Sequence, residues 1–200
     1  MDKKVLNHFR KADPILFSAA KRVKSLKELK PRKHNDLFAA LCRDIIYQQL
    51  SGKVGNVIWA RFVKLFPNGV INPKQVMRLS SSKIRGVGTS WSKVDFMKDL
   101  ANKVINKEVV LENLHKLDNE FVIAELTKVK GIGRWTAEMF LMFSLGREDV
   151  FSPGDLGLRR SIEELYKIRN VTPERAEKIS AKWAPYRTYA SLTLWAMHDN

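Results

Sequence analysis

Residues 126–137, Leu-Thr-Lys-Val-Lys-Gly-Ile-Gly-Arg-Trp-Thr-Ala, decide the fold of this 200-residue chain. Two glycines with one residue between them, Gly131 and Gly133, predict a tight turn. Helical patterns flank the turn, so the stretch predicts a helix, a hairpin and a second helix. Backbone N–H groups in such a turn can bind a phosphate oxygen, and we therefore expect both glycines to contact phosphate.

A dinucleotide-binding fingerprint is the alternative for this stretch, because the acidic residue Asp155 follows the glycines by roughly twenty positions. Three features argue against it. Residues 121–129 have a helical rather than a strand pattern, Thr136 stands where the third glycine belongs, and strands do not alternate with helices around it. The sequence therefore excludes a nucleotide-cofactor fold.

A weaker copy of the hairpin lies upstream, where residues 84–88 read Ile-Arg-Gly-Val-Gly. Gly86 and Gly88 predict a second phosphate contact, with Arg85 and Lys93 as basic residues beside it. Two such turns could bind two points of one backbone. An ordinary helix–helix turn without a ligand remains the alternative for this copy.

The rest of the chain has apolar residues at helical rather than alternating spacing, as in residues 37–46, 54–65 and 94–104. Proline and glycine divide this pattern into short segments. We expect an all-α chain of about ten to twelve helices and no sheet, because the strand-like fragment 149–151 is too short to stand alone.

The charge is large and uneven. Lys plus Arg number 36 and Asp plus Glu 21, for a net charge of +15. Residues 1–100 carry +14 of it and residues 101–200 only +1. Such a field attracts a polyanion, either nucleic acid or an anionic membrane surface. A basic surface that serves only solubility is the alternative.

The single cysteine, Cys42, lies on an apolar stripe and is expected to be a buried small hydrophobe rather than a ligand or nucleophile. The first residues carry charges instead of the apolar core of a signal peptide, and apolar runs are too short for a membrane span. We expect an intracellular protein that does not enter a membrane.

The motifs together resemble the helix-hairpin-helix DNA glycosylase superfamily. The resemblance rests on the hairpin at 131–133, on Ser-Pro-Gly-Asp-Leu-Gly-Leu-Arg-Arg at 152–160 and on Tyr-Gln-Gln-Leu-Ser at 47–51. It runs from about residue 36 to the C-terminus and is closest to the alkylation-repair branch, the 3-methyladenine DNA glycosylase II type. The resemblance implies an all-α fold of two helical lobes with the active-site cleft between them. It implies a sequential hairpin lobe at 36–146 and a C-terminal lobe at 147–200 that contains Asp155, with N-terminal helices at 1–35 that pack with the C-terminal lobe.

Two departures from the wider superfamily limit the chemistry. Trp135 stands where strand-cleaving members have a Schiff-base lysine, so a lyase step is not expected. Members with an iron–sulfur cluster have four cysteines, and this chain has one. The resemblance therefore implies a monofunctional hydrolase that needs no cofactor.

Asp155 is the catalytic residue that the resemblance implies. Breaking an N-glycosidic bond develops positive charge on the sugar, which a carboxylate can stabilise, or the carboxylate can deprotonate the attacking water. The Pro-Gly-Asp order also predicts Asp155 as the N-cap of a helix over 156–166. A purely structural cap is the alternative.

Aromatic residues are expected to bind the damaged base, because a ring-alkylated base is cationic and is attracted to aromatic faces. By resemblance the pocket comprises Trp135 and Trp195, with Tyr47 as a third wall; core burial is the alternative for Trp195. The remaining tryptophans, predicted to be packing residues, are Trp59, Trp91 and Trp183.

Leu50 matches the wedge that fills the gap left by a flipped nucleotide, and Gln48 and Gln49 are expected beside that gap. Burial of Leu50 at a helix end is the alternative. Further predicted phosphate contacts are Arg134, Thr136, Arg159 and Arg160. As in relatives, the carbonyls of Thr127, Val129 and Ile132 are expected to suit a structural monovalent cation, Na⁺ or K⁺.

The sequence thus predicts a monomeric enzyme that flips alkylated bases out of double-stranded DNA and leaves an abasic site. It would act in the cytoplasm or nucleoid of a prokaryote, or in the nucleus of a eukaryote. Two alternatives remain: a non-catalytic helix-hairpin-helix DNA-binding protein, and a glycosylase for mismatched or oxidised bases.

Overall fold

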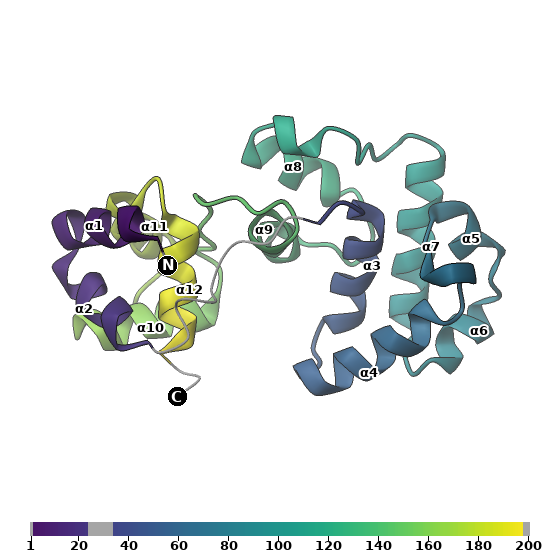
Figure 1. Cartoon of the computed structure of the whole chain (residues 1–200), viewed down its shortest axis with the longest axis horizontal. Helices are drawn as coiled ribbons and strands as arrows, with labels where there is room; N and C mark the ends of the chain where they lie inside the picture. Colours follow the sequence, from purple (N-terminus) through teal and green to yellow (C-terminus); the bar gives the residue numbers. More distant parts are fainter. Residues whose placement is uncertain (1, 24–33, 198–200) are drawn as a thin grey trace. The chain divides into compact units, whose positions relative to one another are not determined.

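The computed structural model describes residues 2–23 and 34–197. These residues form twelve α-helices and three short 3-10 helices, and they include no strand (Figure 1). The predicted all-α fold class is confirmed. No helix in the described part of the chain is long and apolar enough to cross a membrane.

The chain divides into two compact units. The first comprises residues 1–33 and 141–200, and the second comprises residues 34–140. The sequence predicts boundaries after residues 35 and 146. The first unit therefore combines the two ends of the chain, while the second is continuous in sequence.

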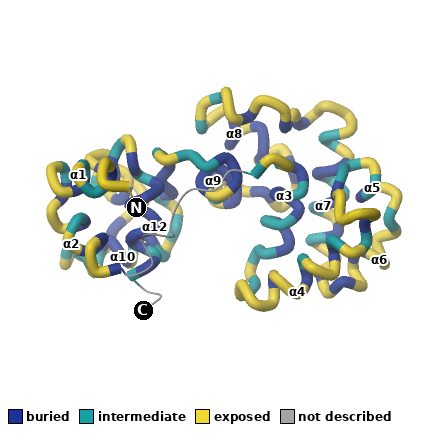
Figure 2. The backbone as a smooth tube through the Cα atoms, in the orientation of Figure 1, coloured by how far each residue is buried: buried dark blue, intermediate teal, exposed yellow. Residues whose placement is uncertain are grey.

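The first unit contains α1 (Lys3–Ala12), α2 (Pro14–Arg22), α10 (Leu156–Tyr166), α11 (Pro173–Ser180) and α12 (Arg187–Ala196). Its core includes Phe9, Leu158 and Trp183, which are all fully buried. Helix α12 is the central element, since most of its residues are buried, and its tube is largely dark blue in Figure 2.

A buried carboxylate joins the N-terminal helices to the C-terminal ones. Asp13 is 1% exposed, and its side chain caps α2 by accepting the N–H of Leu16 at 3.1 Å. It also accepts the indole N–H of Trp183 at 2.7 Å and the hydroxyl of Tyr166, and it pairs with the Lys182 ammonium at 3.0 Å. Four donors from two parts of the sequence thus converge on one carboxylate.

The second unit contains α3 (Leu37–Tyr47), α4 (Gly52–Val63), α5 (Pro73–Arg78), α6 (Ser81–Gly86), α7 (Trp91–Ile105), α8 (Asn119–Leu126) and most of α9 (Arg134–Phe143). The 15-residue α7 packs against α3, α5 and α6 through buried Val94, Met97 and Leu100. Their spacing of three residues places them on one face, so a single helix organises this unit.

Local signals set the helix starts. Nearly every described helix begins after a Ser, Thr, Asp or Asn whose side chain accepts a backbone N–H of the first turn, which satisfies an otherwise unpaired donor. Examples are Asp36 before α3, Ser51 before α4, Ser90 before α7, Asp118 before α8 and Thr172 before α11.

Candidate active site and nucleic-acid interface

The hairpin predicted at residues 131–133 lies between α8 and α9. Gly131 has φ +77°, the left-handed region that favours glycine, and a Cβ there would lie 2.1 Å from the ring of Phe96 on α7. Val129 and Ile132 are 2% and 3% exposed and anchor the turn in the core. The turn therefore requires glycine at 131, because a side chain there would displace an aromatic ring.

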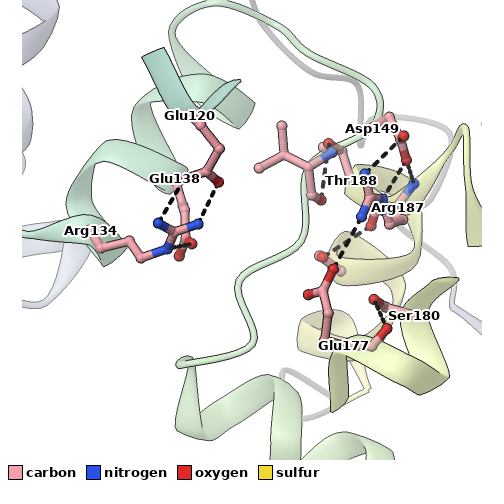
Figure 3. Close-up of polar contacts among 10 residues, drawn as sticks. Glu120, Arg134, Glu138, Asp149, Glu177, Ser180, Arg187 and Thr188 are labelled. Carbon is pink, nitrogen blue, oxygen red and sulfur yellow. Dashed lines mark hydrogen bonds and ion pairs between the residues drawn. The ribbon is translucent and has the colours of Figure 1, made fainter. Parts of the chain in front are cut away.

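Arg134, the first residue of α9, is held by two carboxylates (Figure 3). Its guanidinium donates to both oxygens of Glu120, at 3.0 and 2.5 Å, and its Nε donates to Glu138 at 3.0 Å. The hydrogen bond from Arg134 holds the pKa of Glu120 below its ordinary value. Because Glu120 and Arg134 are both more than half exposed, water screens the pair. The phosphate contact of Arg134 stays a prediction.

The predicted wedge segment lies at the break between α3 and α4. Tyr47 ends α3, Gln49 is exposed with φ +57°, and Leu50 is half-buried, with its N–H donating to the Tyr47 carbonyl at 3.1 Å. The Gln48 side chain donates to the Gly131 carbonyl at 2.8 Å. The wedge segment and the hairpin thus meet inside one unit, although 83 positions separate them in sequence.

Two predicted phosphate contacts have partners inside this unit. Thr136 is 7% exposed and its hydroxyl accepts from the Gln48 amide at 3.4 Å. The Lys93 ammonium donates to the carbonyls of Ile46 and Gln48 at 2.8 and 2.6 Å. Both side chains therefore support the wedge segment.

Tyr47 lies against its own unit. Its hydroxyl donates to Asn56, its ring is 2.8 Å from where a Cβ of Gly55 would stand, and the Arg43 guanidinium lies 4.8 Å from the ring centroid. The ring lines a pocket of about 330 Å³ with Trp59 and other residues of α3 and α4. Its role as a wall of the base pocket stays a prediction.

The upstream Gly-x-Gly turn joins α6 to α7. Gly88 has φ +106°, and the Thr89 hydroxyl donates to the Ile84 carbonyl at 3.1 Å to close the turn. Gly86 and Arg85 are exposed beside it. The turn exists as predicted, while its phosphate contact stays a prediction.

Asp155 begins α10, as predicted. Its Oδ1 accepts the N–H of Leu158 at 2.8 Å, which caps the helix, and also the indole N–H of Trp195 at 3.4 Å. The side chain is half-buried, at the edge of the first unit rather than in its core. The structure thus brings together two residues that the sequence assigned to one site from positions 40 residues apart.

Helices α10 and α12 are joined next to this pair. Ser161 is fully buried and its hydroxyl bonds to the carbonyls of Gly157 and Leu194, at 2.9 and 3.0 Å. Phe143 lies beside Trp195 with ring centroids 6.1 Å apart. The indole is therefore fixed by its neighbours, and it offers a polarised N–H to the carboxylate.

The segment that leads to Asp155 is tied to α12 as well. Arg187 donates to both oxygens of Asp149, at 2.8 and 3.1 Å, and the Thr188 hydroxyl accepts the N–H of Val150 at 3.0 Å (Figure 3). These bonds connect the chain just before the Ser-Pro-Gly-Asp turn with the helix that carries Trp195. The position of the carboxylate therefore depends on side chains with no catalytic signature in the sequence.

The other tryptophans have mixed outcomes. Trp183 is fully buried, which confirms it as a packing residue, whereas Trp91 is 55% exposed, so that prediction is wrong. Trp91 is on the same stripe as buried Val94, but it lies in the first turn of α7, beyond the core that this stripe covers. Trp59 is half-buried, and Trp135 on α9 is 48% exposed.

Cys42 is fully buried, as predicted, and burial raises the pKa of its thiol. A neutral thiol in a core is inert, which agrees with its interpretation as a small hydrophobe. The sequence did not point to Phe143, Ser161 or the acceptors of Lys93, because each depends on contacts between distant helices rather than on local spacing.

Known proteins are similar to this chain in sequence and in fold. The family model of the HhH-GPD superfamily base excision DNA repair proteins matches residues 42–186. DNA-3-methyladenine glycosylase 1 of Schizosaccharomyces pombe is 36% identical over 161 residues, 79% of this chain and 71% of that protein. The DNA-3-methyladenine glycosylase of Saccharomyces cerevisiae is 31% identical, with 95% of this chain and 77% of that protein covered.

A solved structure gives the same result. The Schizosaccharomyces pombe 3-methyladenine DNA glycosylase in complex with abasic DNA has a TM-score of 0.86 at 31% identity, covering 99% of this chain and 98% of that one. The family model spans well over half of the chain. This chain therefore belongs to the HhH-GPD superfamily of base excision DNA repair proteins, as its hairpin and its Asp155 segment predict.

Proposed function

We propose that the chain is a monofunctional DNA glycosylase that flips alkylated bases, of the 3-methyladenine type, out of double-stranded DNA and hydrolyses their N-glycosidic bond. The observation that carries the proposal is the Asp155 carboxylate, fixed at the start of α10 and bonded to the Trp195 indole at 3.4 Å. The identities to 3-methyladenine glycosylases along most of the chain support this substrate class.

In the reaction, the bond between the sugar C1′ and the base nitrogen breaks, and its electron pair leaves with the base. An alkylated, cationic base becomes neutral as it leaves, so it needs no general acid. The positive charge develops on the sugar, where Asp155 stabilises it. Water attacks C1′ and loses its proton to the carboxylate or to solvent, and an abasic site remains.

The aromatic side chains supply the affinity for the base. A cationic ring gains cation–π attraction from an indole face, and Trp195 is held in place by Phe143 and by its bond to Asp155. Trp135, in the place of a lysine, has no amine to form a Schiff base. This supports hydrolysis without strand cleavage.

The second unit binds DNA in this proposal. The hairpin and the α6–α7 turn bind phosphates, Leu50 fills the gap left by the flipped nucleotide, and the positive charge of the first hundred residues attracts the duplex. The enzyme acts as a monomer wherever the cell keeps its DNA, which is the cytoplasm or nucleoid of a prokaryote or the nucleus of a eukaryote.

The hairpin also suits a structural Na⁺ or K⁺. Backbone carbonyls are the ligands that such hard cations prefer, and those of Thr127, Val129 and Ile132 follow one another in the turn after α8. The Val129 carbonyl accepts the Ile132 N–H at 3.1 Å and has a second lone pair for a cation. The cation would order the hairpin and take no part in bond cleavage.

The test is base release from a panel of duplexes that carry alkylated, deaminated or oxidised bases. We expect release of alkylated bases. Release of only oxidised or mismatched bases would give the chain a different substrate class. Tight binding without release from any duplex would make it a non-catalytic DNA-binding protein.

A further inference from the structure

One face of α7 contacts both DNA-binding elements of the second unit. Lys93, Phe96 and Asp99 follow one another at intervals of three residues, which places them on one side of the helix. The Lys93 ammonium reaches the wedge segment, the Phe96 ring packs on Gly131 of the hairpin, and a carboxylate oxygen of Asp99 accepts the N–H of Lys130 at 2.8 Å.

Lys93 binds the wedge segment at the point where α3 ends. The last carbonyls of a helix have no partner within it, and a lysine can supply the missing donors. The ammonium donates to the Ile46 carbonyl at 2.8 Å and to the Gln48 carbonyl at 2.6 Å, two positions before Leu50. Burial lowers the pKa of Lys93, in keeping with an ammonium taken partly out of water.

Gln48, whose carbonyl accepts from Lys93, is also bound to the hairpin through its side chain. The Gln48 side chain donates to the Gly131 carbonyl at 2.8 Å and lies 3.4 Å from the Thr136 hydroxyl. The backbone of Gln48 is thus held by α7, and its side chain by the hairpin. A residue fixed from two sides just before Leu50 sets the direction in which the leucine projects.

We infer that Lys93 is a positioning residue for base flipping: it holds Leu50 in register with the phosphate-binding hairpin. This inference rests on the proposed function, since it needs Leu50 as the wedge. It differs from the phosphate contact predicted for Lys93, because the ammonium acts here through backbone carbonyls of its own unit. Loss of the ammonium would therefore impair wedge insertion more than the attraction to DNA.

The chain contains a matched control five residues further along α7. Lys98 is also half-buried, burial also lowers its pKa, and its ammonium also donates to two carbonyls, those of Met77 and Leu79 at 2.9 and 2.5 Å. These carbonyls lie at the end of α5, outside the wedge segment and the hairpin. Lys98→Met removes the same kind of bond without touching either element.

Wedge insertion can be measured without catalysis. A duplex with a tetrahydrofuran abasic-site analogue and 2-aminopurine as the neighbouring base becomes more fluorescent when a wedge unstacks the base. We expect Lys93→Met to reduce this signal and single-turnover base release about tenfold or more. Lys98→Met should keep the fluorescence signal and the base-release rate within about twofold of the wild type, although it should lose about as much melting temperature as Lys93→Met.

Two further measurements separate positioning from phosphate binding. If Lys93 acts through Leu50, the double variant Lys93→Met/Leu50→Ala should lose little more base-release rate than Leu50→Ala alone. The salt dependence of binding to undamaged duplex should keep its slope in Lys93→Met. Additive losses, or a slope reduced by about one unit, would assign Lys93 to a phosphate and overturn the inference.

The remaining outcomes are also decisive. Equal losses in Lys93→Met and Lys98→Met would reduce Lys93 to a general structural role. Should Lys93→Met fail to fold, Lys93→Gln keeps an N–H donor group without the charge, and its fluorescence rise should be smaller than that of the wild type. A rise equal to that of the wild type would overturn the inference. If the wild-type protein raises the fluorescence of this duplex but releases no base from any damaged duplex, the proposed function is refuted, while the positioning role of Lys93 stands.

Discussion

Removal of the Asp13 carboxylate should weaken the attachment of α1 and α2 to the C-terminal helices of the first unit and should cost a large part of the unit's stability. In Asp13→Ala, α2 loses its cap, which is worth about 1 kcal/mol. The Trp183 indole N–H and the Tyr166 hydroxyl lose their acceptor inside the core, at about 1–3 kcal/mol each. The exposed Lys182 ammonium returns to water and adds little. The expected loss is therefore about 3–7 kcal/mol.

Urea unfolding followed by tryptophan fluorescence and by circular dichroism measures this loss. Asp36→Ala is the matched control, because Asp36 caps α3 through the Ala39 N–H at 2.9 Å and has no buried donors to satisfy. It should cost only about 1 kcal/mol. Equal losses in the two variants would refute the central role given to the buried carboxylate.

The pH dependence gives a second check on Asp13. Burial alone would raise the pKa of Asp13, but hydrogen bonds from Tyr166, Trp183 and Leu16 hold it below its ordinary value. A lowered pKa means that the carboxylate stabilises the fold above about pH 4, and that this stability is lost as the pH falls through the folded-state pKa. The difference between wild type and Asp13→Ala should therefore shrink in acid.

Three further predictions concern the second unit and the reaction product. Burial raises the pKa of Asp44 to about 7, so its ionisation destabilises the fold as the pH rises. Asp44→Asn should therefore be more stable than the wild type at pH 8 and about as stable near pH 4. The same gain in stability at both pH values would contradict this. Affinity for undamaged duplex should fall steeply between low and moderate salt, and a flat dependence would contradict the charge argument. Treated DNA should carry intact abasic sites that break only after alkali, and borohydride trapping of a covalent adduct would refute a purely hydrolytic mechanism.

Much of the fold followed from local signals. The all-helical class came from apolar spacing, and the start of α10 came from the Pro-Gly-Asp order, in which the carboxylate is the residue type that accepts the first free N–H groups. The sequence also predicts the turn at Gly131, although it does not show that the ring of Phe96 leaves no space for a side chain there. Local chemistry thus places element ends, while the identity of a packing partner depends on the tertiary structure.

The polar contacts of the candidate site were harder to predict for the same reason. Lys93, Arg134 and Thr136 are basic or hydroxylic residues beside glycine turns, and sequence alone assigns such residues to phosphates. The structure gives each of them a partner within its unit, through helices packed from distant parts of the chain, and their phosphate contacts stay predictions. Spacing cannot show such partners, and the wrong prediction for Trp91 has a related cause, since periodicity does not tell where a core ends.

The central claim is that the Asp155 charge stabilises the transition state, and Asp155→Asn tests it most directly. The substitution keeps the shape and an oxygen for the Leu158 N–H, but removes the charge. Thr172→Ala is the control, because it removes the cap of α11 in the same unit and leaves the cap of α10 in place. Single-turnover base release and melting temperature should be measured on the same preparations.

We expect Asp155→Asn to lose on the order of a hundredfold or more in rate, about 3 kcal/mol, with DNA binding and melting temperature nearly unchanged. Thr172→Ala should lose melting temperature and keep its rate. Full activity of Asp155→Asn with a lowered melting temperature would show that Asp155 is only a helix cap and would contradict the proposed mechanism.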